Sequence, residues 1–116
     1  MKLQINTDNT VEGGAELVEM VEARVRSAME RYEDRLTRIE AHLSDEDGQK
    51  SGSGTDKRCL LEARPAGLDP VVVTGASDTL ERACTDALRK MQSLLDTTFG
   101  RIDDRDGDAT IRQSES

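Results

Sequence analysis

The chain has 116 residues, with 24 acidic side chains against 16 basic ones and a formal net charge of −8, which speaks against a partner as acidic as nucleic acid. The length suits one domain, and with no Trp, one Tyr and one Phe we expect its core to be aliphatic. No apolar run approaches the roughly 20 residues that span a membrane, and the first residues are no signal peptide, so we expect a cytoplasmic protein.

The acidic charge is concentrated in two stretches. Residues 44–56 carry four acidic side chains against one lysine, and residues 103–116 carry five against two arginines, so each stretch has a net charge of −3. We expect a flexible loop over residues 45–56 and a disordered acidic tail over residues 103–116. The folded domain would then be residues 1–102, which can carry a local basic patch despite the acidity of the whole chain.

The first two predicted elements are a short strand and an amphipathic helix. Residues 2–6 alternate polar and apolar side chains, which predicts a strand. Residues 15–34 follow a helical period with an apolar stripe on one side. On this helix most glutamates project away from the stripe, whereas Arg24 and Arg31 share one of its flanks.

Three further strands are predicted next. Residues 36–44 alternate again, which indicates a strand with one solvent-exposed face. Residues 57–64 form the following strand, and a turn bounded by two prolines leads to a valine-rich strand over residues 71–76. The side chains expected to face the core in the first two of these strands are Thr37, Ile39, Ala41, Leu43, Cys59, Leu61 and Ala63.

The longest helical pattern runs from Asp78 to Ile102. Its apolar stripe is too wide to remain in water, and the sheet is the element that can cover it. Asp78 and Glu81 have the spacing of a capping box, which predicts the start of the helix. Gly100 is a stop signal near its other end.

These elements give the order β-α-β-β-β-α, which predicts an α+β fold. The first β-α-β unit should form a right-handed crossover between parallel strands, and the last three strands an antiparallel meander. Both helices then pack on the same face of a four-stranded mixed sheet. Cys59 and Cys84 occupy apolar positions of a strand and a helix, so we interpret them as buried free thiols, with a disulfide as the alternative.

The sequence shows no catalytic constellation. His42, its only histidine, falls on the exposed face of a strand beside Glu40 and is interpreted as a solvated side chain. Two cysteines and one histidine make no metal-ligand set, and the acidic run at residues 45–47 lacks the spacing of a calcium loop. We therefore expect no enzyme, no metal, no cofactor and no small-molecule substrate.

Positive charge on the flanks of the two helices is the remaining candidate chemistry. Arg24 and Arg31 on the first helix, with Arg89 and Lys90 on the second, can form a groove that accepts a phosphate backbone. The alternative is a pair of ordinary solvated helix faces, where carboxylates such as Asp86 neutralise part of this charge.

Three stretches, taken in combination, are similar to a known family. They are residues 17–25 leading into 32–39, residues 59–67, and residues 76–83 leading into 87–91. Together with the β-α-β-β-β-α order they resemble the ribosome hibernation-promoting factor family, also called ribosome-associated inhibitors or sigma-54 modulation proteins. The resemblance covers residues 1–102, and because the family's long form adds a C-terminal domain, this chain looks like a short form.

The resemblance implies a translation inhibitor that performs no catalysis. Members of this family bind the small ribosomal subunit in the channel of messenger and transfer RNA, and so hold idle ribosomes inactive. Basic residues of the two helices meet phosphates of the 16S ribosomal RNA there. Carried over to this sequence, the resemblance nominates four helical residues and, less strongly, three on the third strand: Arg24, Arg31, Arg89, Lys90, Lys57, Arg58 and Arg64.

An acidic adaptor domain is the alternative function. It would bind a basic protein partner, without RNA, through the glutamate-rich face of the first helix, and the net charge of −8 favours it. Recovery of the same partner after RNA is destroyed would distinguish this adaptor from a ribosome-bound inhibitor.

Overall fold

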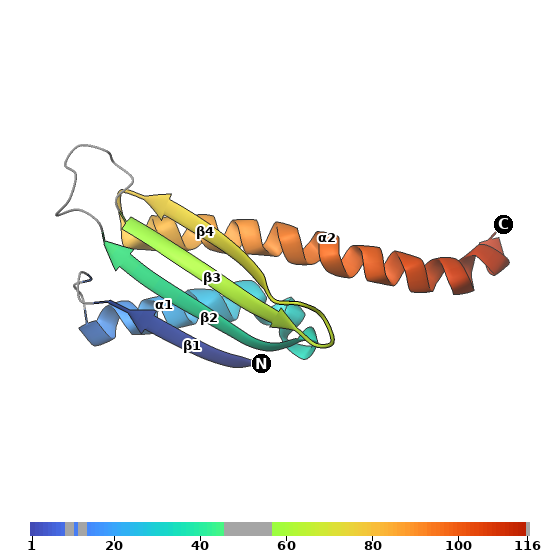
Figure 1. Cartoon of the computed structure of the whole chain (residues 1–116), viewed down its shortest axis with the longest axis horizontal. Helices are drawn as coiled ribbons and strands as arrows, with labels where there is room; N and C mark the ends of the chain where they lie inside the picture. The colour runs from blue at the N-terminus through green and yellow to red at the C-terminus, as the bar shows by residue number, and fades with distance from the viewer. Residues whose placement is uncertain (9–10, 12–13, 46–56, 116) are drawn as a thin grey trace.

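The computed structural model of the chain (Figure 1) describes residues 1–8, 11, 14–45 and 57–115, with side chains as far as Asp103. Within these ranges the elements are the strand β1 (Lys2–Thr7), the helix α1 (Gly14–Met29), the 3₁₀ helix η1 (Glu30–Arg35), the strands β2 (Leu36–Asp45), β3 (Lys57–Pro65) and β4 (Val71–Ser77), and the helix α2 (Leu80–Glu115). This order confirms the predicted β-α-β-β-β-α arrangement. The predicted loop over residues 45–56 lies, except for Asp45, outside the described residues.

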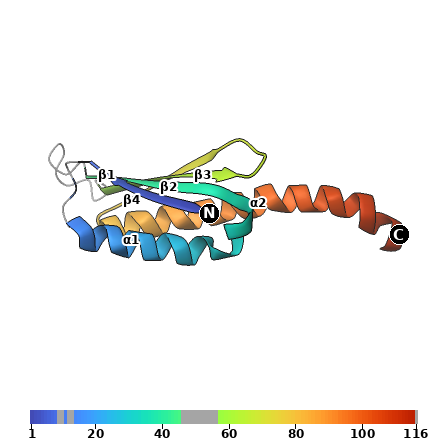
Figure 2. The same cartoon turned by 90° about the horizontal axis from the view of Figure 1, so that it is seen from below.

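The described strands form one mixed sheet in the order β1-β2-β3-β4. β1 runs parallel to β2, as expected from a crossover through α1, and the other two neighbouring pairs are antiparallel. Figure 2 shows α1 and α2 on the same face of this sheet, so the predicted α+β architecture is confirmed. No described element covers the opposite face.

Successive side chains of β2 and β3 point to opposite faces of the sheet, and this alternation decides which of them enter the core. The buried side chains of these strands form four directly opposed pairs: Leu36–Pro65, Ile39–Ala63, Ala41–Leu61 and Leu43–Cys59. Thr37, which the sequence pattern places in the core, is exposed instead, because the register shifts between Leu36 and Arg38. This bulge adds one residue, buries Leu36, and lets the Thr37 hydroxyl donate to the Arg64 carbonyl at 3.0 Å.

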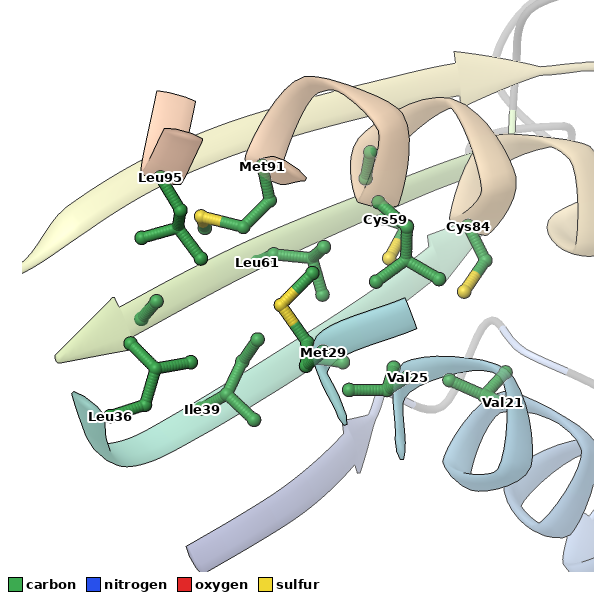
Figure 3. Packing of buried hydrophobic residues seen from close by; sticks show 14 of the residues in the cluster. Val21, Val25, Met29, Leu36, Ile39, Cys59, Leu61, Cys84, Met91 and Leu95 are labelled. Atoms are coloured by element: carbon green, nitrogen blue, oxygen red, sulfur yellow. The ribbon is translucent and has the colours of Figure 1, made fainter. Parts of the chain in front are cut away.

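The helices complete the core with the apolar stripes that the sequence predicts. Figure 3 shows Val21, Val25 and Met29 of α1, together with Met91 and Leu95 of α2, directed toward the strands. All five side chains are fully buried, so each helix is held to the sheet by one continuous apolar face.

Cys59 and Cys84 are buried free thiols, as predicted. The adjacent Cys84 thiol and burial both raise the pKa of the Cys59 thiol above its ordinary value, so this group stays protonated. A protonated and inaccessible thiol is a poor nucleophile and a poor metal ligand. Both cysteines are fully buried and pack as small apolar core residues.

α2 begins at a different cap from the predicted one. Thr79 Oγ1 accepts a hydrogen bond from the Arg82 backbone N–H at 3.0 Å, which makes Thr79 the N-cap residue. The capping box predicted from Asp78 and Glu81 is therefore wrong by one residue. Asp78 instead accepts a hydrogen bond from the Ser77 hydroxyl and pairs with Arg82 at 3.3 Å, and both contacts lower the pKa of its carboxyl.

Both helices end elsewhere than their periodicity predicts. α1 ends at Met29, and its expected last turn tightens into η1. α2 continues past the expected end at Ile102, and Figures 1 and 2 show this extension projecting beyond the sheet. Gly100 does not stop the helix, because its backbone lacks the positive φ of a C-cap glycine. The division between a folded domain and an acidic tail at residue 103 stays a prediction.

Gly75 of β4 marks a close approach between α2 and the sheet. A Cβ atom at this position would lie 2.2 Å from the carbonyl oxygen of Ala83 and 2.5 Å from the backbone nitrogen of Ala87. Only glycine leaves room for the helix backbone here, which explains a glycine in the middle of a valine-rich strand.

Candidate nucleic-acid interface

Ion pairs join the segment formed by α1 and η1 to the helix α2. We call the line along which these two segments face each other the seam. Among the described residues, three arginines of α1 and η1 each meet a carboxylate of α2. The pairs are Arg24–Glu81, Arg31–Asp96 at 2.7 Å and Arg35–Asp103 at 3.1 Å. Residue numbers rise together on both sides, so the two segments run parallel. The positive flank predicted for the first helix is therefore partly neutralised by the second.

Arg24 is fixed at one end of this seam. Besides its ion pair with Glu81, its Nε lies 3.1 Å from the Met20 sulfur, and its Nη1 donates to Thr85 Oγ1 at 3.4 Å. The side chain is 39% exposed, so its guanidinium remains accessible while three contacts restrict its orientation.

Arg31 belongs to a network around the single tyrosine. The Tyr32 hydroxyl donates to Asp96 Oδ1 at 2.6 Å and accepts a hydrogen bond from Arg31, whose guanidinium also lies 4.8 Å from the centre of the tyrosine ring. Burial raises the pKa of Tyr32, and the hydrogen bond with Tyr32 raises the pKa of Arg31. This network joins η1 to α2, so Arg31 has a structural role that a phosphate contact would disturb.

Replacing Tyr32 with phenylalanine tests this network. The substitution leaves Asp96 and the backbone carbonyl of Gln92, 3.2 Å away, without the hydroxyl donor. We expect the free energy of unfolding, measured by urea denaturation, to fall by about 1–2 kcal/mol. Thr97→Val removes an exposed hydroxyl from α2, the helix that carries Asp96 and Gln92. It should change the free energy of unfolding by less than about 0.5 kcal/mol. Equal effects of the two variants would mean that the network does not join the helices.

Arg89 and Lys90 are neighbours in sequence but lie in different surroundings. Lys90 pairs with Asp86 at 3.3 Å and donates to the Thr74 carbonyl of β4 at 2.9 Å, which directs it to the edge of the sheet. Arg89 is exposed and has no hydrogen-bond or ion-pair partner among the described residues. Arg89 is thus available to an anionic ligand, whereas Lys90 is engaged elsewhere.

A groove between α1 and α2 brings Arg24 and Arg89 together. It has a volume of about 530 Å³. Its described lining combines these two arginines with apolar and neutral polar side chains and includes no acidic residue. In a chain of net charge −8, this is a local surface suited to an anion. A groove thus lies between the two helices, and two of the four cations predicted for it line it. Its binding of a phosphate backbone stays a prediction.

The three strand residues do not join this groove. Arg58 and Arg64 are exposed at alternate positions to the buried residues of β3, so they lie on the sheet face opposite the helices. Arg64 is 3.5 Å from Glu62, and Lys57 pairs with Asp45 at 3.2 Å at the end of the strand. The seven nominated residues therefore belong to separate parts of the surface.

Other candidate chemistry is sparse in the described part of the chain. His42 is exposed and lies 3.2 Å from Glu40, as predicted. The described residues contain no group of three His, Cys, Asp or Glu side chains that could hold a metal ion. No helix of the described chain is both long and apolar enough to cross a lipid bilayer.

Known proteins are similar to this chain in structure rather than in sequence. No family model and no curated protein matches the sequence. The N-terminal domain of Protein Y from Thermus thermophilus matches at a TM-score of 0.63 and 18% identity, over 84% of this chain and 99% of that one. A ribosomal subunit interface protein from Coxiella burnetii matches at a TM-score of 0.65 and 14% identity, over 86% and 99%. The chain has the fold of these two proteins. The resemblance inferred from the sequence is thereby confirmed at the level of the fold.

Some residues of the interface were not anticipated from the sequence. Arg35, which the sequence places just beyond the flank of Arg24 and Arg31 but which is not among the nominated residues, pairs with Asp103 and lies 4.1 Å from the centre of the Phe99 ring. Met20 and Thr85, which position Arg24, carry no sequence signal, because their role depends on how the two helices are rotated against each other.

Proposed function

We propose that this protein is a ribosome-associated translation inhibitor that binds the small ribosomal subunit in the channel of messenger and transfer RNA. The observation that carries the proposal is the fold, shared over most of the chain with a protein named for the ribosomal subunit interface. The groove with Arg24 and Arg89 is the surface best suited to phosphates of 16S ribosomal RNA. The mechanism is occlusion in the cytoplasm, without catalysis.

The carboxylates of α2 set the strength of this binding. Arg24 and Arg31 already have anionic partners, so a phosphate must replace a carboxylate rather than water. Binding then releases fewer counterions than the number of basic residues suggests, and its salt dependence is shallow. Arg89 has no carboxylate to displace among the described residues and contributes most per contact.

Neutralising one of these carboxylates should strengthen binding. Glu81→Gln breaks the ion pair of Arg24 and removes a negative charge near the groove, while the contacts of Arg24 with Met20 and Thr85 remain. We expect affinity for small subunits to rise by about 2- to 5-fold at low salt, the range of an exposed ion pair. Glu30→Gln makes the same change of total charge at an exposed residue away from the groove and should have a smaller effect. Equal gains from both variants would show that total charge, not the ion pair, controls affinity.

Competition with messenger RNA tests the proposed function. Empty small subunits are incubated with the chain, and binding of a labelled messenger RNA is measured together with inhibition of translation in vitro. We expect the chain to reduce messenger binding as its own occupancy rises. Full occupancy on the subunit without any loss of messenger binding would contradict occlusion of the channel.

An acidic adaptor is the second candidate function. The glutamates Glu16, Glu19, Glu30 and Glu33 are exposed and have no hydrogen-bond or ion-pair partner among the described residues. Such a surface suits a basic protein. A pull-down from nuclease-treated lysate separates the candidates, because recovery of one basic partner, lost on replacing these glutamates with glutamine, would favour the adaptor.

A further inference from the structure

The groove between α1 and α2 has an apolar floor as well as positive charge. Met20, Ala23 and Ala28 of α1 face Leu88 of α2 across it. The two alanines leave space that larger side chains would fill, and Leu88 closes the bottom, since it is only 5% exposed. A groove of about 530 Å³ with such a floor can accept a flat apolar group, not only a phosphate ion.

The two arginines of the groove offer different contacts. The Arg24 guanidinium is restrained by Met20, Thr85 and Glu81, so its plane is held in place. A guanidinium plane is a surface on which an unstacked base can lie. Arg89 has no partner among the described residues and can turn toward an anionic group at the rim.

Neutral polar groups complete the lining. Ser27 is exposed on α1, and the Gln92 amide of α2 donates to the Ala28 carbonyl at 3.0 Å, which fixes the side chain beside the floor. These groups can both donate and accept hydrogen bonds, as the edges of a base require. An acidic peptide could also pair with Arg89, but it would make no use of a restrained guanidinium plane.

We propose that this groove binds one unpaired nucleotide of single-stranded RNA. The base packs on the apolar floor formed by Leu88, Ala23 and Ala28 and stacks against the Arg24 guanidinium, and the adjoining phosphate meets Arg89. This inference rests on the proposed function and deepens it, because it states that the chain contacts an unpaired strand rather than a duplex at this site.

Filling the groove without changing its charge tests the inference. Ser27→Trp places a ring over the floor from an exposed position, and Ser93→Trp adds the same ring to an exposed position of α2 outside the groove lining. Fluorescence anisotropy with labelled RNA measures affinity for a short unstructured strand and for a duplex of the same length. We expect Ser27→Trp to weaken single-strand binding about 10-fold, as for the loss of one stacked base, and duplex binding less than about 2-fold. Ser93→Trp should change neither.

Three outcomes would overturn the inference. The first is equal loss of single-strand and duplex binding, which would indicate phosphate contacts alone. The second is a free mononucleotide that binds at least as tightly as the single strand, which would indicate a small-molecule site. The third is displacement by an acidic peptide with no preference for single strands, which would indicate a protein partner.

Sedimentation with small subunits, run in parallel, separates this inference from the proposed function. If wild type binds single-stranded RNA as expected but does not sediment with subunits, the ribosomal function fails and the nucleotide site stands. If wild type and Ser27→Trp sediment equally and neither prefers single strands, the nucleotide site fails and the ribosomal function stands.

Discussion

Replacing Gly75 with alanine is expected to lower the free energy of unfolding by about 3 kcal/mol or more, at or above the upper end of overpacking effects. The added Cβ would lie 2.2 Å from the Ala83 carbonyl oxygen and 2.5 Å from the Ala87 nitrogen. Both are backbone atoms of α2, so no side-chain rotation can relieve the contact, and the helix must move off β4. Urea denaturation followed by circular dichroism measures the loss.

Gly100→Ala is the matched control for this substitution. Nothing lies within 4 Å of a Cβ atom at Gly100, and its backbone is helical. Alanine there should stabilise the protein by about 0.5–1 kcal/mol, because it is the better helix former. A Gly75→Ala protein as stable as wild type would contradict the packing of α2 on β4. A destabilising Gly100→Ala would contradict the continuation of α2 through this residue.

Reversing the charge of both groove arginines should give the largest loss of ribosome binding. Arg24→Glu and Arg89→Glu together remove both basic groups of the groove and add two carboxylates, which repel RNA, to a lining that has no acidic residue. We expect affinity for small subunits at low salt to fall about 100-fold, with a shallower dependence on salt than wild type. Co-sedimentation across a salt series measures both quantities.

The control for this double variant changes total charge equally. Arg26→Glu and Arg64→Glu act at exposed arginines outside the groove lining, one on α1 and one on the open face of the sheet. Affinity should then fall much less than for the groove variant. A loss of the same size would contradict the groove as the main contact, because either total charge or the strand residue Arg64 would then account for binding.

The fold could be predicted from the sequence because each element carries its own periodicity. Apolar side chains at every second position, Ile39, Ala41 and Leu43, identify the buried face of β2 independently of the strand with which β2 pairs. The exposure of Thr37 could not be predicted, because the bulge arises only when β2 pairs with β3. The continuation of α2 past Gly100 could not be predicted, because a glycine stops a helix only if its backbone adopts positive φ, which sequence alone does not decide.

The site was less predictable, because it depends on two helices at once. Positions on one helix wheel place Arg24 and Arg31 on a common flank, but their partners Glu81 and Asp96 come from the other helix. The same limit applies to Lys90, which the wheel cannot direct toward the edge of β4. Pairing of charges across a seam requires the rotation and offset of both helices, and neither follows from a single element's pattern.

A cryo-electron microscopy map of the chain bound to empty small ribosomal subunits would show which surface of the protein meets the ribosome. We expect the groove between α1 and α2 to face ribosomal RNA in the channel of messenger and transfer RNA, with Arg89 within hydrogen-bonding distance of a phosphate. Density that places the open face of the sheet against the RNA, or the glutamates of α1 against a basic ribosomal protein with the groove in solvent, would contradict it.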